Sequence, residues 1–171
     1  MDGILTGSEL TFSHWPDIRA HLRYTSDWIH WRYKSIPHHD HTIIGIPAKN
    51  ELAIYRIEPV LHTEFSVIRL LEWTFGPESG PAALAFIMAE TSRNNVIWID
   101  FLCFSEDMCR TFNAYGFGCQ QDAGFTGISR WVRPINPSPD LFSVLDIPGI
   151  REGHAVPIQN WYITAGNSTL D

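Results

Sequence analysis

The chain has 171 residues, which is the length of one ordinary domain and is enough to bury a core. Apolar residues make up 44% and charged residues 18%, a balance that is typical of a globular protein and excludes a disordered chain. The formal net charge of −7 and the lack of a long basic run argue against nucleic acid or an anionic membrane surface as a partner.

Targeting and redox signals are weak in this sequence. The longest apolar runs, such as residues 82–89, are too short to cross a bilayer. The stretch MDGILTGSEL has an acidic residue at position 2 and no basic region, so we expect no signal peptide. Cys103, Cys109 and Cys119 lack CxxC spacing, which favours reduced thiols in a cytoplasmic protein over a disulfide framework.

The first part of the chain predicts a β-prone piece at 3–12 and then two helices. Residues 15–24 carry a proline in the first turn and then an apolar stripe, which indicates a helix. Residues 25–35 begin with Thr25, a good N-cap type, and Pro37 ends the segment.

Three strands are predicted next, at 41–46, 51–58 and 64–75. The last of them is the richest in branched and aromatic residues. Their short connections imply antiparallel neighbours.

The second half alternates between helix and strand. A helix over 81–95 joins the strand at 64–75 to a mostly apolar strand at 96–104, of the kind found inside parallel sheets. Ser105 suits the N-cap of another helix, which Gly116 ends. The remaining expected segments are a strand at 124–135, a Pro-rich passage at 134–148 and a last strand at 160–166.

Four local stretches, taken with this order of elements, point to one family. LLEWTFGPESGPAAL joins a strand to a helix through a glycine-bordered loop, and RTFNAYGFG ends a helix with a Gly-Phe step. WRYKSIP precedes the first of the three strands, and WYITAGNSTLD ends the sequence. With the order β-α-α-β-β-β-α-β-α-β-β, these stretches resemble the GNAT (N-acetyltransferase) superfamily over nearly the whole chain. The last stretch is similar to GNAT-like proteins associated with sugar or polysaccharide loci.

The resemblance implies an α/β fold with a GNAT-like mixed central sheet in a single domain, residues 1–171. The N-terminal strand and helices would occupy 1–40, and the central sheet with two helices 41–131. The Pro-rich passage and the last strand would occupy 132–171.

The resemblance also implies transfer of an acetyl or other acyl group from a CoA thioester to an amine or hydroxyl. The acceptor would be a small molecule or sugar, the co-substrate acetyl-CoA or another acyl-CoA, and no metal is needed; a homodimer is left open. The acyl carrier would lie between two strands that diverge past Phe75 and Phe104. The cofactor-binding residues implied are Trp73, Phe75, Gly76, Ser79 and Gly80.

The glycine-bordered loop has an independent physical rationale, because unpaired N–H groups at a helix start attract phosphate. Several residues depart from the family pattern. Pro77 and Pro81 remove two N–H donors, and Glu78 places a negative charge where a pyrophosphate would lie. Phe112 stands where many of these enzymes have a tyrosine acid. These departures favour the alternative, a catalytically inactive GNAT-like module that binds a partner protein or carbohydrate.

Three residues are candidates for acid–base chemistry: Asp100, Glu72 and Tyr115. Asp100 lies in an apolar strand and is either a general base or a structural partner of Arg56 or Arg69. Glu72 is either a second base or part of a solvated sheet edge. By strand alternation, Glu72 and Arg69 face opposite sides of the sheet.

The stretch His38-His39-Asp40-His41 invites a metal site. Adjacent side chains in an extended loop diverge, and no helical pair of ligands lies nearby, so we interpret it as a polar loop. A role in gripping substrate is the remaining alternative.

Overall fold

The computed structural model describes residues 10, 12–18, 20–21, 24–35, 40–103, 105–118 and 161–162. The helices in this part are α1 (Ser26–Lys34), α2 (Gly80–Arg93), α3 (Glu106–Ala114) and the short 3-10 helix η1 (Pro47–Lys49). The strands are β1 (Ala20–His21), β2 (His41–Ile46), β3 (Glu51–Pro59), β4 (Ser66–Trp73), β5 (Val96–Phe101) and β6 (Trp161–Tyr162).

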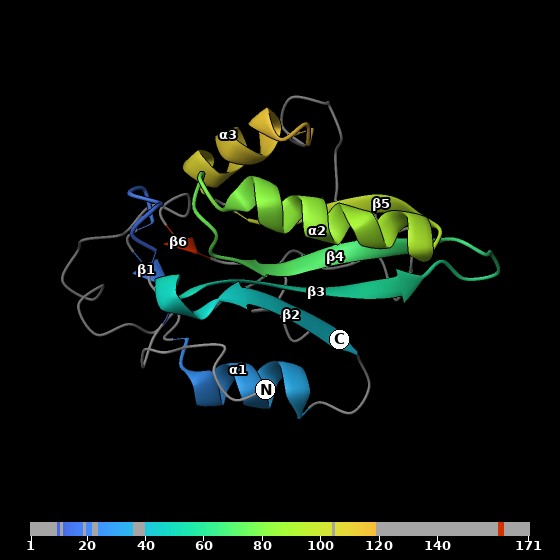
Figure 1. Cartoon of the computed structure of the whole chain (residues 1–171), viewed down its shortest axis with the longest axis horizontal. Coiled ribbons are helices and arrows are strands. Elements are labelled where there is room, and N and C mark those ends of the chain that lie inside the picture. The colour runs from blue at the N-terminus through green and yellow to red at the C-terminus, as the bar shows by residue number, and fades with distance from the viewer. Residues whose placement is uncertain are drawn as a thin grey trace, which may run out of the picture.

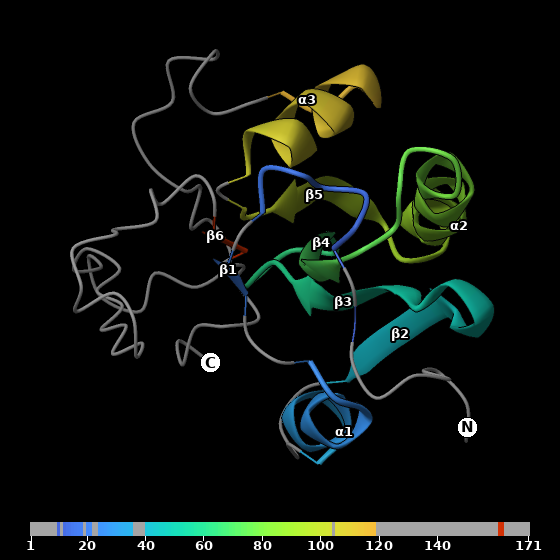
Figure 2. The same cartoon turned by 90° about the vertical axis from the view of Figure 1, so that its left-hand side faces the viewer.

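The main sheet has the strand order β2-β3-β4-β5. β2, β3 and β4 are antiparallel neighbours, whereas β4 and β5 are parallel and are joined through α2. These pairings confirm the antiparallel strands and the parallel crossover expected from the sequence. The fold is therefore mixed α/β, with α1 on one face of the sheet and α2 and α3 on the other (Figures 1 and 2).

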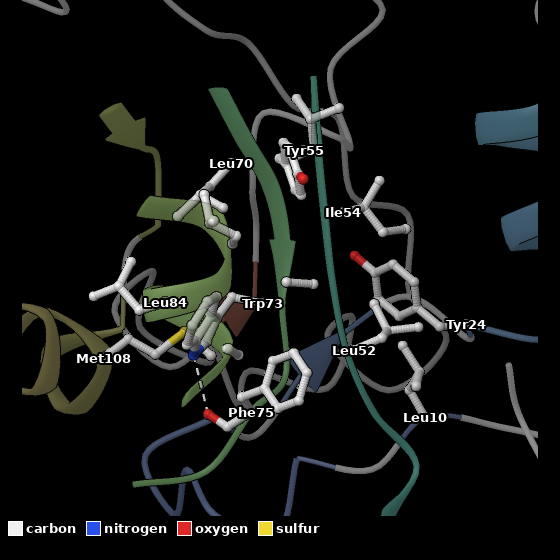
Figure 3. Packing of buried hydrophobic residues seen from close by; sticks show 14 of the residues in the cluster. Leu10, Tyr24, Leu52, Ile54, Tyr55, Leu70, Trp73, Phe75, Leu84 and Met108 are labelled. Carbon is white, nitrogen blue, oxygen red and sulfur yellow. Dashed lines mark hydrogen bonds between the residues drawn. The ribbon is translucent and has the colours of Figure 1, made fainter. Parts of the chain in front are cut away.

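The core fills both sides of the sheet (Figure 3). On the side of α2 and α3, the fully buried ring of Trp73 lies beside Leu84 and Met108. On the opposite side, Ile54 and Tyr24 are buried between the sheet and the N-terminal part of the chain. The β3–β4 pair thus forms the centre of the domain.

The helix predicted over residues 15–24 is wrong. The described part of that segment forms two successive turns, closed by Trp15 N–H to Phe12 O and Ile18 N–H to Trp15 O, followed by β1. The indole of Trp15 is buried and the carboxylate of Asp17 bonds to the start of α3, so tertiary contacts override the local helical pattern. β1 pairs in parallel with β6, within the last predicted strand.

Other predicted elements have mixed outcomes. Thr25 caps α1 by accepting from Trp28 N–H, as expected. Among the described strands β5 is the last of the sheet, and its Trp98 side chain is half exposed; the strand predicted at 124–135, which would lie beyond it, is outside the described residues. Apart from Leu10 and Phe12, the expected piece at 3–12 lies outside the described residues, as do Cys119 and the segments 124–135 and 134–148.

No helix in the described ranges has the length and apolarity needed to cross a bilayer.

Candidate functional site

The glycine-bordered loop, residues 76–80, holds a carboxylate of its own chain. Gly76 N–H donates to Oε1 of Glu51 over 3.2 Å, and the Ser79 hydroxyl donates to Oε2 over 2.6 Å. His14 Nε2 lies 3.0 Å from the same Oε1. Glu51 is only 2% exposed. Two donors of the loop in which the sequence predicted phosphate binding are therefore bonded to the Glu51 carboxylate.

The chain positions Glu51 by a tight turn. η1 ends at Asn50, whose left-handed backbone (φ 52°) redirects the chain into β3. Glu51 is the first residue of β3 and pairs with Ile46. Its side chain consequently lies at the end of the sheet where β4 leads into the loop.

Two further backbone N–H groups at the start of α2 also bond within the chain. Gly80 N–H donates to Gly76 O over 2.8 Å, and Ala83 N–H donates to Ser79 O over 3.1 Å. A Cβ atom at Gly76 would come within 2.7 Å of the His14 ring, and one at Gly80 within 2.5 Å of the Tyr115 hydroxyl. Both glycines thus permit close packing by the protein's own side chains.

The aromatic candidates for cofactor binding are core residues in this structure. Trp73 is fully buried and Phe75 is 3% exposed, and the Trp73 indole donates to Phe75 O over 3.0 Å. The β4–β5 pairing ends at Leu70 and Phe101. There the Phe112 ring of α3 contacts both strands, with its centroid 5.1 Å from that of Trp73 and 5.0 Å from that of Phe101. Phe104 lies outside the described residues.

Glu72 is fully buried and accepts a hydrogen bond of 2.5 Å from the Tyr33 hydroxyl of α1. Burial, and next the charge of Glu72, raise the pKa of Tyr33 above its usual range. The solvated sheet edge considered for Glu72 is therefore wrong. The prediction that Glu72 and Arg69 face opposite sides of the sheet is also wrong. Ile54 pairs with Glu72 and Tyr55 with Leu70, and this bulge places Glu72 and Arg69 on the same face.

Asp100 belongs to a row of charges across the sheet. Arg69 Nη1 lies 2.6 Å from Asp100 Oδ2, and Arg69 Nε lies 2.9 Å from Glu58 Oε2. Arg56 Nε completes the row at 2.5 Å from Glu58 Oε1. Burial raises the pKa of Asp100 to about 6, because Arg69 is shared with Glu58 and only partly offsets the cost of desolvation. The pairing with Arg69 is one of the alternatives that the sequence left open.

Tyr115 borders a surface groove of about 470 Å³. The groove is lined by the turn at 14–16, by Pro77 of the loop, and by one face of α3 from Asp107 to Tyr115. The Tyr115 hydroxyl is buried and has no hydrogen-bond partner among the described residues, and burial raises its pKa. Sequence reasoning selected Tyr115 but not the groove beside it.

Hydrogen bonds join the two walls of this groove. The Asp17 carboxylate accepts from the Ser105 hydroxyl over 2.9 Å and from Asp107 N–H over 3.1 Å. The Ser105 oxygen in turn accepts from Met108 N–H over 3.1 Å, as an N-cap should. The turn and α3 are therefore held together at the start of the helix.

Replacing Ser105 with alanine should lower the free energy of unfolding by about 1–2 kcal/mol, because it removes the cap and the bond to Asp17. Urea unfolding followed by circular dichroism measures this loss. Ser35→Ala, at an exposed position after α1, is the matched control and should change stability by less than about 0.5 kcal/mol. Equal losses in the two variants would contradict the capping role.

The three acid–base candidates lie in separate surroundings. Glu72 contacts Tyr33, Asp100 contacts Arg69, and Tyr115 packs against Gly80. Sequence reasoning missed Glu51 because its partners follow 25 and 28 residues later in the chain. The sequence contains one local sign of this role for Glu51. An acidic residue directly follows a turn-prone stretch and is the first residue of a buried strand.

The histidine-rich stretch is described only at its end. His41 is buried, with Nδ1 3.1 Å from Tyr33 O, and Asp40 is exposed, while His38 and His39 lie outside the described residues. Within the part of the chain that the structure describes, no three potential metal-binding side chains come together.

No protein-family model, curated protein or solved structure matches the chain.

Proposed function

We propose that this chain is a catalytically inactive, GNAT-like domain that binds a partner protein at the groove beside α3. The observation that carries the proposal is the Glu51 carboxylate, which accepts from Gly76 N–H and the Ser79 hydroxyl. Two donors of the loop therefore already hold an anion of the chain itself, which leaves fewer donors for the phosphates of an acyl-CoA.

Electrostatics makes this arrangement unfavourable for a pyrophosphate. Two unit charges about 4 Å apart repel by about 4 kcal/mol at an effective dielectric constant of about 20. Moving the Glu51 side chain aside would leave a buried carboxylate without its partners, which is also costly. Glu78 adds a further negative charge to the same loop.

The two carboxylate candidates for a general base are engaged in the fold. Glu72 is buried beneath α1 with Tyr33, and Asp100 pairs with Arg69. Each contact restrains the carboxylate away from the groove residues of α3. These positions suit structural roles better than proton transfer to a substrate in the groove.

A second candidate is the acyltransferase itself, using acetyl-CoA or another acyl-CoA and a small-molecule or sugar acceptor. Two observations favour it: the Tyr115 hydroxyl lacks a partner among the described residues, and the pKa of Asp100 is raised to about 6. Tyr115 would then act as the acid, whereas Asp100 could serve as the base only after leaving Arg69. Gly76, Ser79 and Gly80 would hold the cofactor only after Glu51 moves away.

Isothermal titration calorimetry with acetyl-CoA separates the two candidates. Wild-type protein should give no saturable heat at sub-millimolar ligand, and an assay for free thiol should detect no acetyl-CoA consumption. Saturable binding together with release of CoA thiol would contradict the proposal and support the acyltransferase. The same samples are checked for cooperative thermal unfolding, so that misfolded protein is not mistaken for a negative result.

A further inference from the structure

The outer face of α2 is apolar although it is exposed. The helix carries no charged residue from Gly80 to Ala89, and the side chains of Phe86 and Met88 on its outer side are 53% and 47% exposed. Figure 2 shows α2 end-on at the outer side of the sheet. A surface helix normally has a polar outer face, and a helix that is apolar all round is normally covered. This face therefore indicates an interaction surface.

A row of exposed residues runs along this face, from the turn before α2 to the last residue of the helix. The turn already has a helical hydrogen bond, because Gly80 N–H donates to Gly76 O, so Glu78 lies about one turn before Ala82 on the same side. At about 3.6 residues per turn, all members of the row fall within roughly 50° of one line along the helix. We call them the α2 row: Glu78, Ala82, Ala85, Phe86, Ala89 and Arg93.

The α2 row is complementary to itself in charge. Glu78 and Arg93 lie at equal distances from the midpoint between Ala85 and Phe86, each about 11 Å away along the helix axis. A second copy of the chain that packs its own α2 here in the antiparallel direction is related to the first by a two-fold axis. That symmetry places Glu78 of each copy beside Arg93 of the other. A second copy thus supplies both matching charges.

The row is also complementary to itself in shape. The antiparallel arrangement places the ring of Phe86 over Ala85 of the second copy, and Ala82 over Ala89. Alanine side chains let two helices approach to the short end of the usual separation of about 8–10 Å. A crossing angle of about 20°, as in antiparallel bundles, keeps the charged ends of the row within reach of one another.

Both charged ends of the row are accessible. Glu78 is exposed and makes no ion pair within the described ranges. The Arg93 side chain is 73% exposed, and its contact with Glu90 of the same helix is an exposed ion pair that contributes little to stability. Neither side chain has to leave a buried partner in order to reach a second copy.

We infer that the chain forms a two-fold dimer in which the outer faces of two α2 helices pack antiparallel, with Phe86 at the centre and Glu78 against Arg93 at both ends. One helix, about 21 Å long, covers less than the roughly 800 Å² per partner of a standard interface, so we expect a weak dimer with a dissociation constant of about 10 µM to 1 mM. The chain is then monomeric at the low concentrations of a spectroscopic unfolding experiment. This inference goes beyond the proposed function and does not depend on a ligand in the groove beside α3.

Sedimentation velocity of the full chain at increasing protein concentration tests the dimer. We expect the sedimentation coefficient to rise from the monomer value towards the dimer value. Phe86→Glu should weaken the dimer at least about tenfold, because both copies lose the central ring. Trp31→Glu is the matched control: Trp31 is a 61% exposed aromatic residue of α1, on the opposite face of the sheet, and its loss should leave the dimer unchanged. Both rings are exposed, so both variants should keep the wild-type melting temperature.

Charge reversal tests the antiparallel direction. Glu78→Arg and Arg93→Glu should each weaken the dimer about tenfold, because like charges then meet at both ends. An equimolar mixture of these two variants should associate as the wild type does, since every end of the one variant is positive and every end of the other is negative. The double variant Glu78→Arg/Arg93→Glu should also recover the affinity.

Three outcomes would overturn the inference. The first is a chain that stays monomeric up to about 1 mM, the weakest affinity expected here. The second is a dimer that Phe86→Glu and Trp31→Glu weaken equally, which would place the interface elsewhere. The third is a failure of both the mixture and the double variant to recover the affinity, which would exclude the antiparallel pairing of Glu78 with Arg93.

Discussion

Replacing Glu51 with alanine is expected to lower the free energy of unfolding by about 2–4 kcal/mol. The substitution leaves the Gly76 N–H and the Ser79 hydroxyl buried without their acceptor, and each unsatisfied donor costs about 1–3 kcal/mol. Urea unfolding at neutral pH, with circular dichroism and tryptophan fluorescence as probes, measures the loss.

Glu78→Gln is the matched control for this experiment, because Glu78 is an exposed glutamate of the same loop. It should change stability by less than about 0.5 kcal/mol. Glu51→Gln keeps one acceptor oxygen and should fall between wild type and Glu51→Ala. If Glu51→Ala cost no more than Glu78→Gln, the Glu51 carboxylate would not be the group that holds the loop.

Replacing Arg69 with methionine should destabilise the protein at pH 8 by about 1–3 kcal/mol, because this partly buried ion pair lies between an exposed pair (below about 1 kcal/mol) and a fully buried one (about 3–5 kcal/mol). The change leaves Asp100 and Glu58 close together on the sheet without the cation that they share. Arg93→Met, at an exposed pair with Glu90 on α2, is the control and should cost less than about 1 kcal/mol.

The penalty of Arg69→Met should shrink as the pH falls. In wild type, the raised pKa of Asp100, about 6, means that its charged form destabilises the fold above pH 6 and that this cost disappears near pH 4. The pKa of Glu58 is lowered by the arginines, so its contribution is stabilising above the unfolded value and is lost in acid. Without Arg69, the Asp100 and Glu58 carboxylates lower the free energy of unfolding only when they carry their negative charges. Protonation at low pH therefore removes most of the penalty. A penalty that stayed constant from pH 8 to pH 4 would contradict this role of Arg69.

The sequence predicted best those elements whose signals are local. Thr25 and Ser105 are N-caps in the structure, and the short connections made β2, β3 and β4 antiparallel neighbours. The turn at 13–17 could not be predicted in this way, because burial of Trp15 and the bonds of Asp17 to α3 depend on distant residues.

The candidate site was harder to predict, for physical reasons. The bulge that skips Leu71 changes which residues share a face, and no sequence pattern marks it. Glu51 meets the loop only after the strands have paired. The alternatives weighed for Asp100 included its true partner, Arg69, because a buried acid needs a nearby cation.

The groove was not foreseen because its walls come from three separate parts of the chain. Tyr115 was selected as a candidate acid from the family resemblance, whereas the structure places its hydroxyl against Gly80. Phe112, where the resemblance predicted a tyrosine in other proteins, packs from α3 against Trp73 of β4 and Phe101 of β5.

The most direct measurement follows the backbone amide resonance of Gly76 while acetyl-CoA is added to the wild-type protein. If Glu51 holds the donors of the loop, this resonance should remain unchanged up to millimolar ligand, because Gly76 N–H is already bonded to the carboxylate. A saturable shift of the Gly76 amide would show that a phosphate displaces Glu51, and would contradict the account.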